Sequence, residues 1–237
     1  MSHRLSGAID FTNPLILQAW RTAWRLLQGC TQSEGLGVML SRRSPCSPLT
    51  AALVIQARTA LPRLIQSARQ LDLVSSLAIA LPLLGAGPGL TPSWDDLLIG
   101  FLCGLRDTSG SDPSRCQFIN QFGRAMARAS TKTTAVSRAY IQRTIDGAGP
   151  AWIEDALAAI ATGDSMGTHA ATARALRVGH TSGVDMMLGV ILGSAVWQHG
   201  SEVNQVLSAL SCRRCEFHPI SDDNHKRPSS PQLPEPR

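Results

Sequence analysis

Apolar residues recur at helical spacing along most of the chain, and short joints containing glycine, proline or serine separate these stretches. Residues 14–28 are a clear case, because they place Trp20, Trp24 and Leu27 on one face ahead of a stop at Gly29. An apolar segment over residues 71–84 leads into a glycine-rich loop. The same spacing predicts further helices over residues 49–70 (with a kink or break at Pro62), from Ser93 to about 106, and over 115–129, 134–146, 151–162, 168–178 and 182–200.

The two ends of the chain do not follow this pattern. Residues 35–40 are a candidate short strand, and residues 41–48 form a loop rich in proline and serine. Residues 217–237 hold proline, serine and charge, and too little apolar surface to become ordered. We therefore expect a mainly α protein. It would be a compact multi-helix domain (49–216) with a short, irregular or β-containing N-terminal segment (1–48) and a disordered tail (217–237).

Composition agrees with a helical, cytoplasmic protein. Of 237 residues, 43% are hydrophobic but only 5% aromatic, so the core must rest on Ala, Leu, Ile and Val. The net charge of +5 comes from scattered basic residues without interleaved aromatics, which argues against nucleic acid and favours small anionic partners. The N-terminus lacks the apolar run of a secretory signal, and the apolar stretches are too short to span a membrane. The six cysteines are then expected to be reduced thiols.

The most informative feature is a local pattern that occurs twice. Residues 85–104 read GAGPGLTPSWDDLLIGFLCG, and residues 181–189 read TSGVDMMLG. Both contain serine, then an aspartate three residues later, then a glycine four residues further on inside an apolar helix. The matched pairs are Ser93 with Ser182, Asp96 with Asp185, and Gly100 with Gly189.

Two interpretations of this repeat stay open. Serine followed by an acidic residue three positions later is typical of a capped helix start, and capping alone would account for these side chains. The glycines inside the helices, however, indicate close backbone approach, and Asp95 is a second carboxylate that a cap does not need. The functional interpretation brings two helix starts together around a small anion, an amide or ammonium group, or a magnesium ion.

Other polar groups also have two interpretations. The segment 130–138 (STKTTAVSR) is either a helix start capped by Thr133 or Thr134, or a hydroxyl-rich, cationic wall of the same pocket. His180 precedes the second copy of the repeat and is a candidate acid or base, or a surface residue. Cys212, Cys215 and His218 have zinc-ligand spacing, but the cluster lacks a second such pair.

The stretch GPGLTPSWDDLLIGFL resembles the signature G-x-G-P-G-L-T-P-S-G-D-D-F-L-x-G of the bacterial oxamate carbamoyltransferase subunit family (AllH-type). The Thr-Thr-x-x-Ser segment at 133–137 and the G-x-T-S-G-x-D segment at 179–185 also match that family in order and spacing. The resemblance covers residues 71–193. One departure is Trp94, which stands where the family pattern has glycine, and the region before the motif is shorter than usual, so the chain is a divergent member.

The resemblance implies reversible carbamoyl transfer between phosphate and oxamate in allantoin catabolism, within a complex of other subunits. Asp95 or Asp96 would be catalytic, orienting an amide nitrogen or acting as a general base. No cofactor is implied, apart from a possible magnesium ion. The alternatives are a non-catalytic helical scaffold that completes a partner's site, and a small zinc-binding module. The substrate-binding positions carried over are Gly87, Gly89, Thr91, Ser93, Thr133, Thr134, Ser137, Thr181, Ser182, Gly183 and Asp185.

Overall fold

The computed structural model describes residues 9–41, 44–198, 204, 206 and 208–210. Its regular elements are all helical within these ranges, which confirms the prediction of a mainly α fold. The α-helices are α1 (Pro14–Gln28), α2 (Pro48–Arg69), α3 (Leu73–Ala80), α4 (Ser93–Thr108), α5 (Pro113–Ala129), α6 (Ala135–Ile145), α7 (Ala151–Ala161), α8 (Ser165–Ala175) and α9 (Ser182–Ala195). The 3-10 helices are η1 (Leu36–Leu40), η2 (Leu81–Leu83) and η3 (Ser130–Lys132).

The expected strand at residues 35–40 is wrong, because this segment forms η1. Its entry depends on Gly35, which has φ 70° in the left-handed region. The N–H groups of Leu36 and Gly37 then turn inward and donate to Asp185 instead of to a neighbouring strand. In the described residues of the N-terminal part, the regular elements are α1 and η1, and no strand is present. The expected disordered tail, 217–237, lies outside the described residues.

Helix boundaries follow the sequence closely, with two informative differences. α2 continues through Pro62 without a break. α8 begins at Ser165, earlier than apolar spacing suggested, because Asp164 caps it by accepting from the N–H groups of Met166 and Gly167. Polar caps of this kind extend a helix beyond its apolar stripe, so periodicity alone places its start too late.

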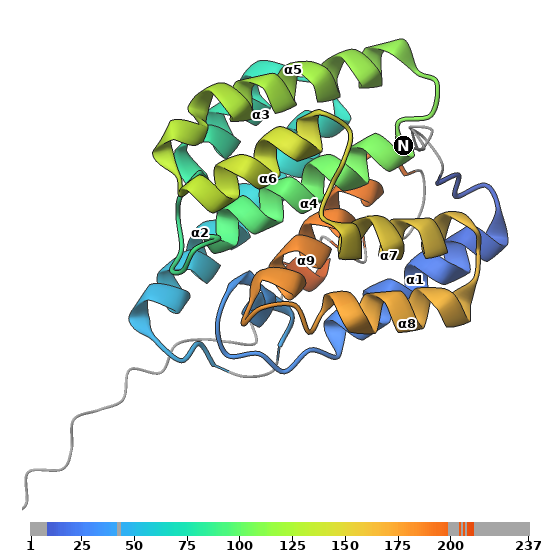
Figure 1. Cartoon of the computed structure of the whole chain (residues 1–237), viewed down its shortest axis with the longest axis horizontal. Helices are drawn as coiled ribbons and strands as arrows, with labels where there is room; N and C mark the ends of the chain where they lie inside the picture. The colour runs from blue at the N-terminus through green and yellow to red at the C-terminus, as the bar shows by residue number, and fades with distance from the viewer. Residues whose placement is uncertain (1–8, 42–43, 199–203, 205, 207, 211–237) are drawn as a thin grey trace, which may run out of the picture.

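The centre of the molecule is the pair α4 and α9, which lie side by side with the other helices around them (Figure 1). α3, α5 and α6 lie on one side, whereas α1, α7 and α8 group on the other. Nearly every residue of α4 and α9 is buried, since both helices are apolar on all faces and both are covered by neighbours. In the described part of the chain, no helix combines the length and apolar character needed to cross a membrane.

Glycines set the geometry of this central pair. A Cβ added at Gly100 would overlap the carbonyl oxygen of Met186, and one at Gly189 would overlap that of Leu97. One turn further along each helix, a Cβ added at Gly104 would overlap the carbonyl oxygen of Val190, and one at Gly193 would overlap that of Phe101. Both series advance in the same direction, so α4 and α9 are parallel and their backbones touch. The close approach that Gly100 and Gly189 indicated in the sequence is therefore present.

Candidate functional site

The parallel packing of α4 and α9 places their N-terminal ends next to each other. The hydroxyls of Thr91, two residues before α4, and of Ser182, the first residue of α9, are hydrogen-bonded at 2.7 Å. Ser93 and Ser182 are the first residues of their helices, and neither Pro92 nor Thr181 before them provides a side-chain cap. The capping interpretation therefore does not account for the repeated serines, whose hydroxyls lie between the two helices.

Asp96 is the least satisfied polar group at this junction. Its side chain is fully buried, and neither carboxylate oxygen has a hydrogen-bond partner of normal geometry among the described residues. The nearby hydroxyls of Ser182 and Thr91 are bonded to each other instead. Burial raises the pKa of Asp96 to about 8, and these two hydroxyls only partly oppose that rise. Near neutral pH, Asp96 is therefore largely an uncharged carboxylic acid.

Asp185, its counterpart on α9, is also fully buried but better held. Its Oδ1 accepts from the N–H groups of Leu36 (2.8 Å) and Gly37 (3.1 Å), which attaches η1 to the start of α9. Burial raises its pKa to about 7, opposed first by the Ser93 hydroxyl and then by those N–H groups. Its Oδ2 has no hydrogen bond of normal geometry within the described ranges.

Asp95 is turned away from this pair. Its Oδ1 accepts from the N–H of Gly85 at 2.7 Å, and its Oδ2 accepts from the hydroxyl of Thr133. Both oxygens are therefore engaged by the protein, and the side chain ties the glycine-rich loop to the start of α6. The two adjacent aspartates expected to share a catalytic role thus have different surroundings, one engaged on both oxygens and one on neither.

The loop before α4 is fixed at several points. Gly85, Gly87 and Gly89 all have positive φ, and a Cβ at Gly87 would approach the Ser93 nitrogen to 2.6 Å. Thr134 caps α6 by accepting from the N–H of Ser137 and also donates to the carbonyl of Leu90 at 2.5 Å. Together with the contacts of Asp95, these hydrogen bonds hold the loop in one backbone conformation.

The remaining predicted residues divide between this junction and its periphery. Thr181 is half-buried beside Gly35 and faces Asp185. Ser137 is fully buried in α6, below the loop. Gly89 has open space around it, so its backbone is accessible. Gly183 faces elsewhere, since a Cβ there would overlap the Ala175 carbonyl of α8.

Trp94 does not occupy the junction. Its indole is fully buried, and the indole N–H donates to Oε1 of Gln56 on α2 at 3.0 Å. It leaves the α4 helix on a different side from Asp96, because residues two apart point about 200° from each other around a helix. The tryptophan that replaces the family's glycine therefore fills the core between α4 and α2.

Backbone donors at the start of α4 are largely used within the protein. The N–H of Trp94 donates to the carbonyl of Ala86, and those of Asp95 and Asp96 donate to that of Pro92. The groups left for a ligand are therefore mainly side chains, namely Asp96, Oδ2 of Asp185 and the hydroxyls of Thr91, Ser93 and Ser182. Sequence reasoning could not find the N–H groups of Leu36 and Gly37, since nothing nearby in sequence links them to Asp185.

Metal ligation finds little support at this junction. Across the described ranges, no three His, Cys, Asp or Glu side chains gather in a way that could hold a metal ion. His180 is exposed, 3.5 Å from the carboxylate of Glu34, and its backbone carbonyl accepts from Gln32. The Cys212–His218 cluster lies outside the described residues.

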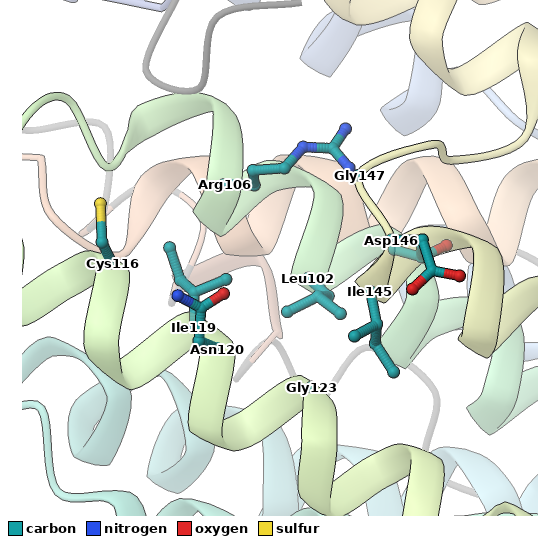
Figure 2. A pocket seen from close by; sticks show the side chains of 10 residues that line it. Leu102, Arg106, Cys116, Ile119, Asn120, Gly123, Ile145, Asp146 and Gly147 are labelled. Atoms are coloured by element: carbon teal, nitrogen blue, oxygen red, sulfur yellow. The ribbon is translucent and has the colours of Figure 1, made fainter. Parts of the chain in front are cut away.

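A separate cavity of about 350 Å³ lies between α4, α5 and α6 (Figure 2). Its floor is apolar, with Leu102, Ile119 and Ile145, and Arg106 lies at its edge. Arg106 already donates to Glu154 at 2.6 Å and lies 3.4 Å from Asp107. The other charged lining residue, Asp146, accepts from Gln142. Because both charged groups at this cavity are engaged by neighbours, the helix starts remain the better candidate site.

Comparison with known proteins identifies one family. Residues 83–194 match the family model described as "Oxamate carbamoyltransferase subunit AllH". The family resemblance is thereby confirmed. The match begins just before the glycine-rich loop and ends within α9, so it contains both helix starts and the glycine contact between them. Neither the curated proteins nor the solved structures gave a significant match to the chain.

Proposed function

We propose that this AllH-type chain is a cytoplasmic subunit of a carbamoyltransferase complex in allantoin catabolism. The complex would act on carbamoyl phosphate and oxamate, or in reverse on oxalurate and phosphate. The start of α4 would bind the amide part of the substrate against Asp96 and Asp185. One observation supports this most directly, a fully buried Asp96 carboxyl group with neither oxygen hydrogen-bonded among the described residues.

A buried carboxyl group without partners is costly, so it suits a ligand that supplies the missing hydrogen bonds. With its pKa raised to about 8, Asp96 is both a donor and an acceptor near neutral pH. A primary carboxamide offers the complementary pair, an N–H donor and a C=O acceptor on adjacent atoms. Oxamate and the carbamoyl group both carry such an amide, whereas free phosphate does not.

The same carboxyl group is suited to proton transfer. During carbamoyl transfer, the oxamate nitrogen attacks the carbamoyl carbon, a C–N bond forms, and the bond from that carbon to the phosphate oxygen breaks. The nitrogen must lose one proton, which Asp96 accepts in the minor fraction of molecules where it is ionised, and later passes to the departing phosphate. A pKa near the working pH favours this exchange, because the group then takes up and releases protons with little bias.

The hydroxyls at the junction would bind the anionic part of the substrate. Thr91 and Ser182 are half-buried and bonded to each other, so each can exchange that bond for one to a carboxylate or phosphoryl oxygen. Asp95 is then a positioning residue that fixes the loop through Gly85 and Thr133. Gly89, two residues before Thr91, has open space at its backbone.

The test is to purify the chain with the proteins encoded beside it and to measure phosphate-dependent breakdown of oxalurate. Asp96→Asn should lower kcat by about a hundred-fold or more and leave assembly intact. Asp164→Asn is the matched control, because Asp164 is an exposed helix cap that asparagine replaces well. Full activity of the Asp96→Asn complex would overturn the catalytic assignment.

A scaffold function without turnover is the second candidate. It is favoured by the direct bond between Thr91 and Ser182, which fills the space between the helix starts. In that case Asp96→Asn would change assembly with the partners and not kcat. The two readouts separate the candidates, because assembly is measured by co-elution and turnover by product formation.

A further inference from the structure

The basic residues are scattered along the sequence, but the net positive charge arises in one hairpin, which corrects the expectation of an evenly spread charge. From Pro113 to Ile145, which spans α5, η3 and α6, the sequence has no Asp or Glu. The other residues are nearly balanced, since the chain's 22 basic residues less the six in this hairpin leave 16 against 17 acidic ones. The six basic residues of this hairpin are Arg115, Arg124, Arg128, Lys132, Arg138 and Arg143.

Exposed apolar side chains lie where this hairpin meets the glycine-rich loop. Leu90 at the tip of the loop is 75% exposed, and Val136 in the first turn of α6 is 39% exposed. They are neighbours in the fold, because Thr134, two residues before Val136, donates to the Leu90 carbonyl. Lys132 and Arg138 are also exposed, and Arg138 lies against the hairpin turn that contains Lys132, because its Nε donates to the carbonyl of Ser130. We call Leu90, Val136, Lys132 and Arg138 the loop–hairpin face.

The loop–hairpin face is rigidly supported. Thr134 holds the loop at Leu90, and Asp95 holds it at Gly85 while bonding Thr133. Arg138 donates from Nε to the carbonyl of Ser130 at 3.4 Å, which places its base against the hairpin turn. An exposed leucine on a fixed loop loses little entropy when it is covered, which is a property of anchor residues in interfaces.

We propose that the loop–hairpin face is where a partner subunit docks, and that the partner presents an acidic surface around an apolar recess for Leu90. An apolar centre with a charged rim is the common anatomy of subunit interfaces, and here the rim has one sign. The proposal rests on the proposed function only in taking the chain to be a subunit of a complex. Docking here would cover the glycine-rich loop and place partner residues beside the start of α4.

The test measures binding of this chain to each purified protein encoded beside it. We expect the double charge reversal Lys132→Glu/Arg138→Glu to weaken binding and so to raise the dissociation constant by roughly ten-fold or more. Leu90→Ser should also weaken binding, and the affinity it loses should be the same at low and high salt. Binding of the wild-type chain should itself weaken as the salt concentration rises, because salt screens the charges. The matched control is Arg63→Glu/Arg174→Glu, which reverses two exposed charges on α2 and α8. Thermal unfolding of each variant alone establishes that it is folded.

Wild-type affinity of both the double reversal and Leu90→Ser would overturn the proposal. Intact assembly with a higher KM for carbamoyl phosphate would also overturn it, because the charges would then attract substrate and not a partner. Failure here is distinguishable from failure of the proposed function. Asp96→Asn tests turnover in an assembled complex, whereas these variants are judged by binding in the absence of substrate.

Discussion

The starts of α4 and α9 have the same register of serine, aspartate and glycine, yet they differ at the positions between. After the serine, α4 has Trp94, which fills the core against Gln56, and α9 has Gly183, which lets the Ala175 carbonyl of α8 approach. The two helices therefore make equivalent contacts with each other, but each packs differently against the helices around it.

The aspartates differ in a corresponding way. Asp185 accepts two backbone N–H groups and joins η1 to the fold, whereas Asp96 accepts none of normal geometry within the described residues. A repeated pattern thus contains one carboxyl group that the backbone engages and one that, in the proposed function, binds a ligand. The repeated sequence pattern identified the junction of the two helices. The different hydrogen-bond partners of Asp96 and Asp185 are the basis for proposing different roles for them.

The largest effect is expected from making the two starts alike. Trp94→Gly gives α4 the glycine that α9 has at Gly183, and it should lower the free energy of unfolding by about 4 kcal/mol. The reason is the cavity left by a fully buried indole, together with loss of the hydrogen bond to Gln56. Denaturant unfolding measures it, and a loss below about 1 kcal/mol would contradict the packing described.

The shared contact should be nearly as sensitive. Gly189→Ala and Gly100→Ala should each lower the free energy of unfolding by about 3 kcal/mol, because a Cβ at either site overlaps a backbone carbonyl. The two losses should also be similar if the helices contribute equally. Gly29→Ala is the control, since the closest atom to its added Cβ is 3.3 Å away and the residue has φ −77°.

Both buried aspartates should make stability fall as pH rises, and substitution of Asp96 isolates its share of that fall. The folded pKa of Asp96 is about 8, above its ordinary 3.8, so its contribution is fully present at low pH and is lost as pH rises through 8. Asp96→Asn should remove a decline on the order of 2 kcal/mol between pH 6 and pH 8. Unfolding followed at several pH values measures this. An unchanged slope would show that Asp96 is ionised in the folded protein.

The smallest effect is expected at the loop. Thr133→Val removes one of the two hydrogen bonds that Asp95 accepts, and should cost about 1 kcal/mol. Amide exchange should quicken at Gly85 and around it, and not in α9. If exchange quickens equally in α9, the loop and the second helix start are more tightly coupled than the contacts indicate.

Much of this arrangement could be predicted from the sequence. Gly100 and Gly189 inside apolar helices indicated close backbone contact, and the contact exists. Thr134, one of two candidate caps, is the N-cap of α6. Each of these predictions depends on residues near one another in sequence or on a repeated pattern, which a single sequence displays directly.

The rest depended on contacts between distant segments. Residues 35–40 have the apolar character of a strand, but their N–H groups bond to Asp185, far along the chain. Adjacent aspartates point about 100° apart, so one of Asp95 and Asp96 had to face elsewhere. Only the position of Gly85 and Thr133 shows that it is Asp95. The side of α4 from which Trp94 emerges was equally undetermined, because it depends on where α2 lies.

The parallel contact between α4 and α9 also has a consequence for how the chain folds. α4 is apolar on nearly every face, yet its closest neighbour, α9, is synthesised only after four further α-helices, α5 to α8, have been completed. Closing so long an intervening segment is slow, and the exposed apolar helix would meanwhile be open to wrong association. During synthesis α4 therefore depends on temporary cover from α5 and α6 or from a chaperone, and truncation before Ser182 should yield aggregates.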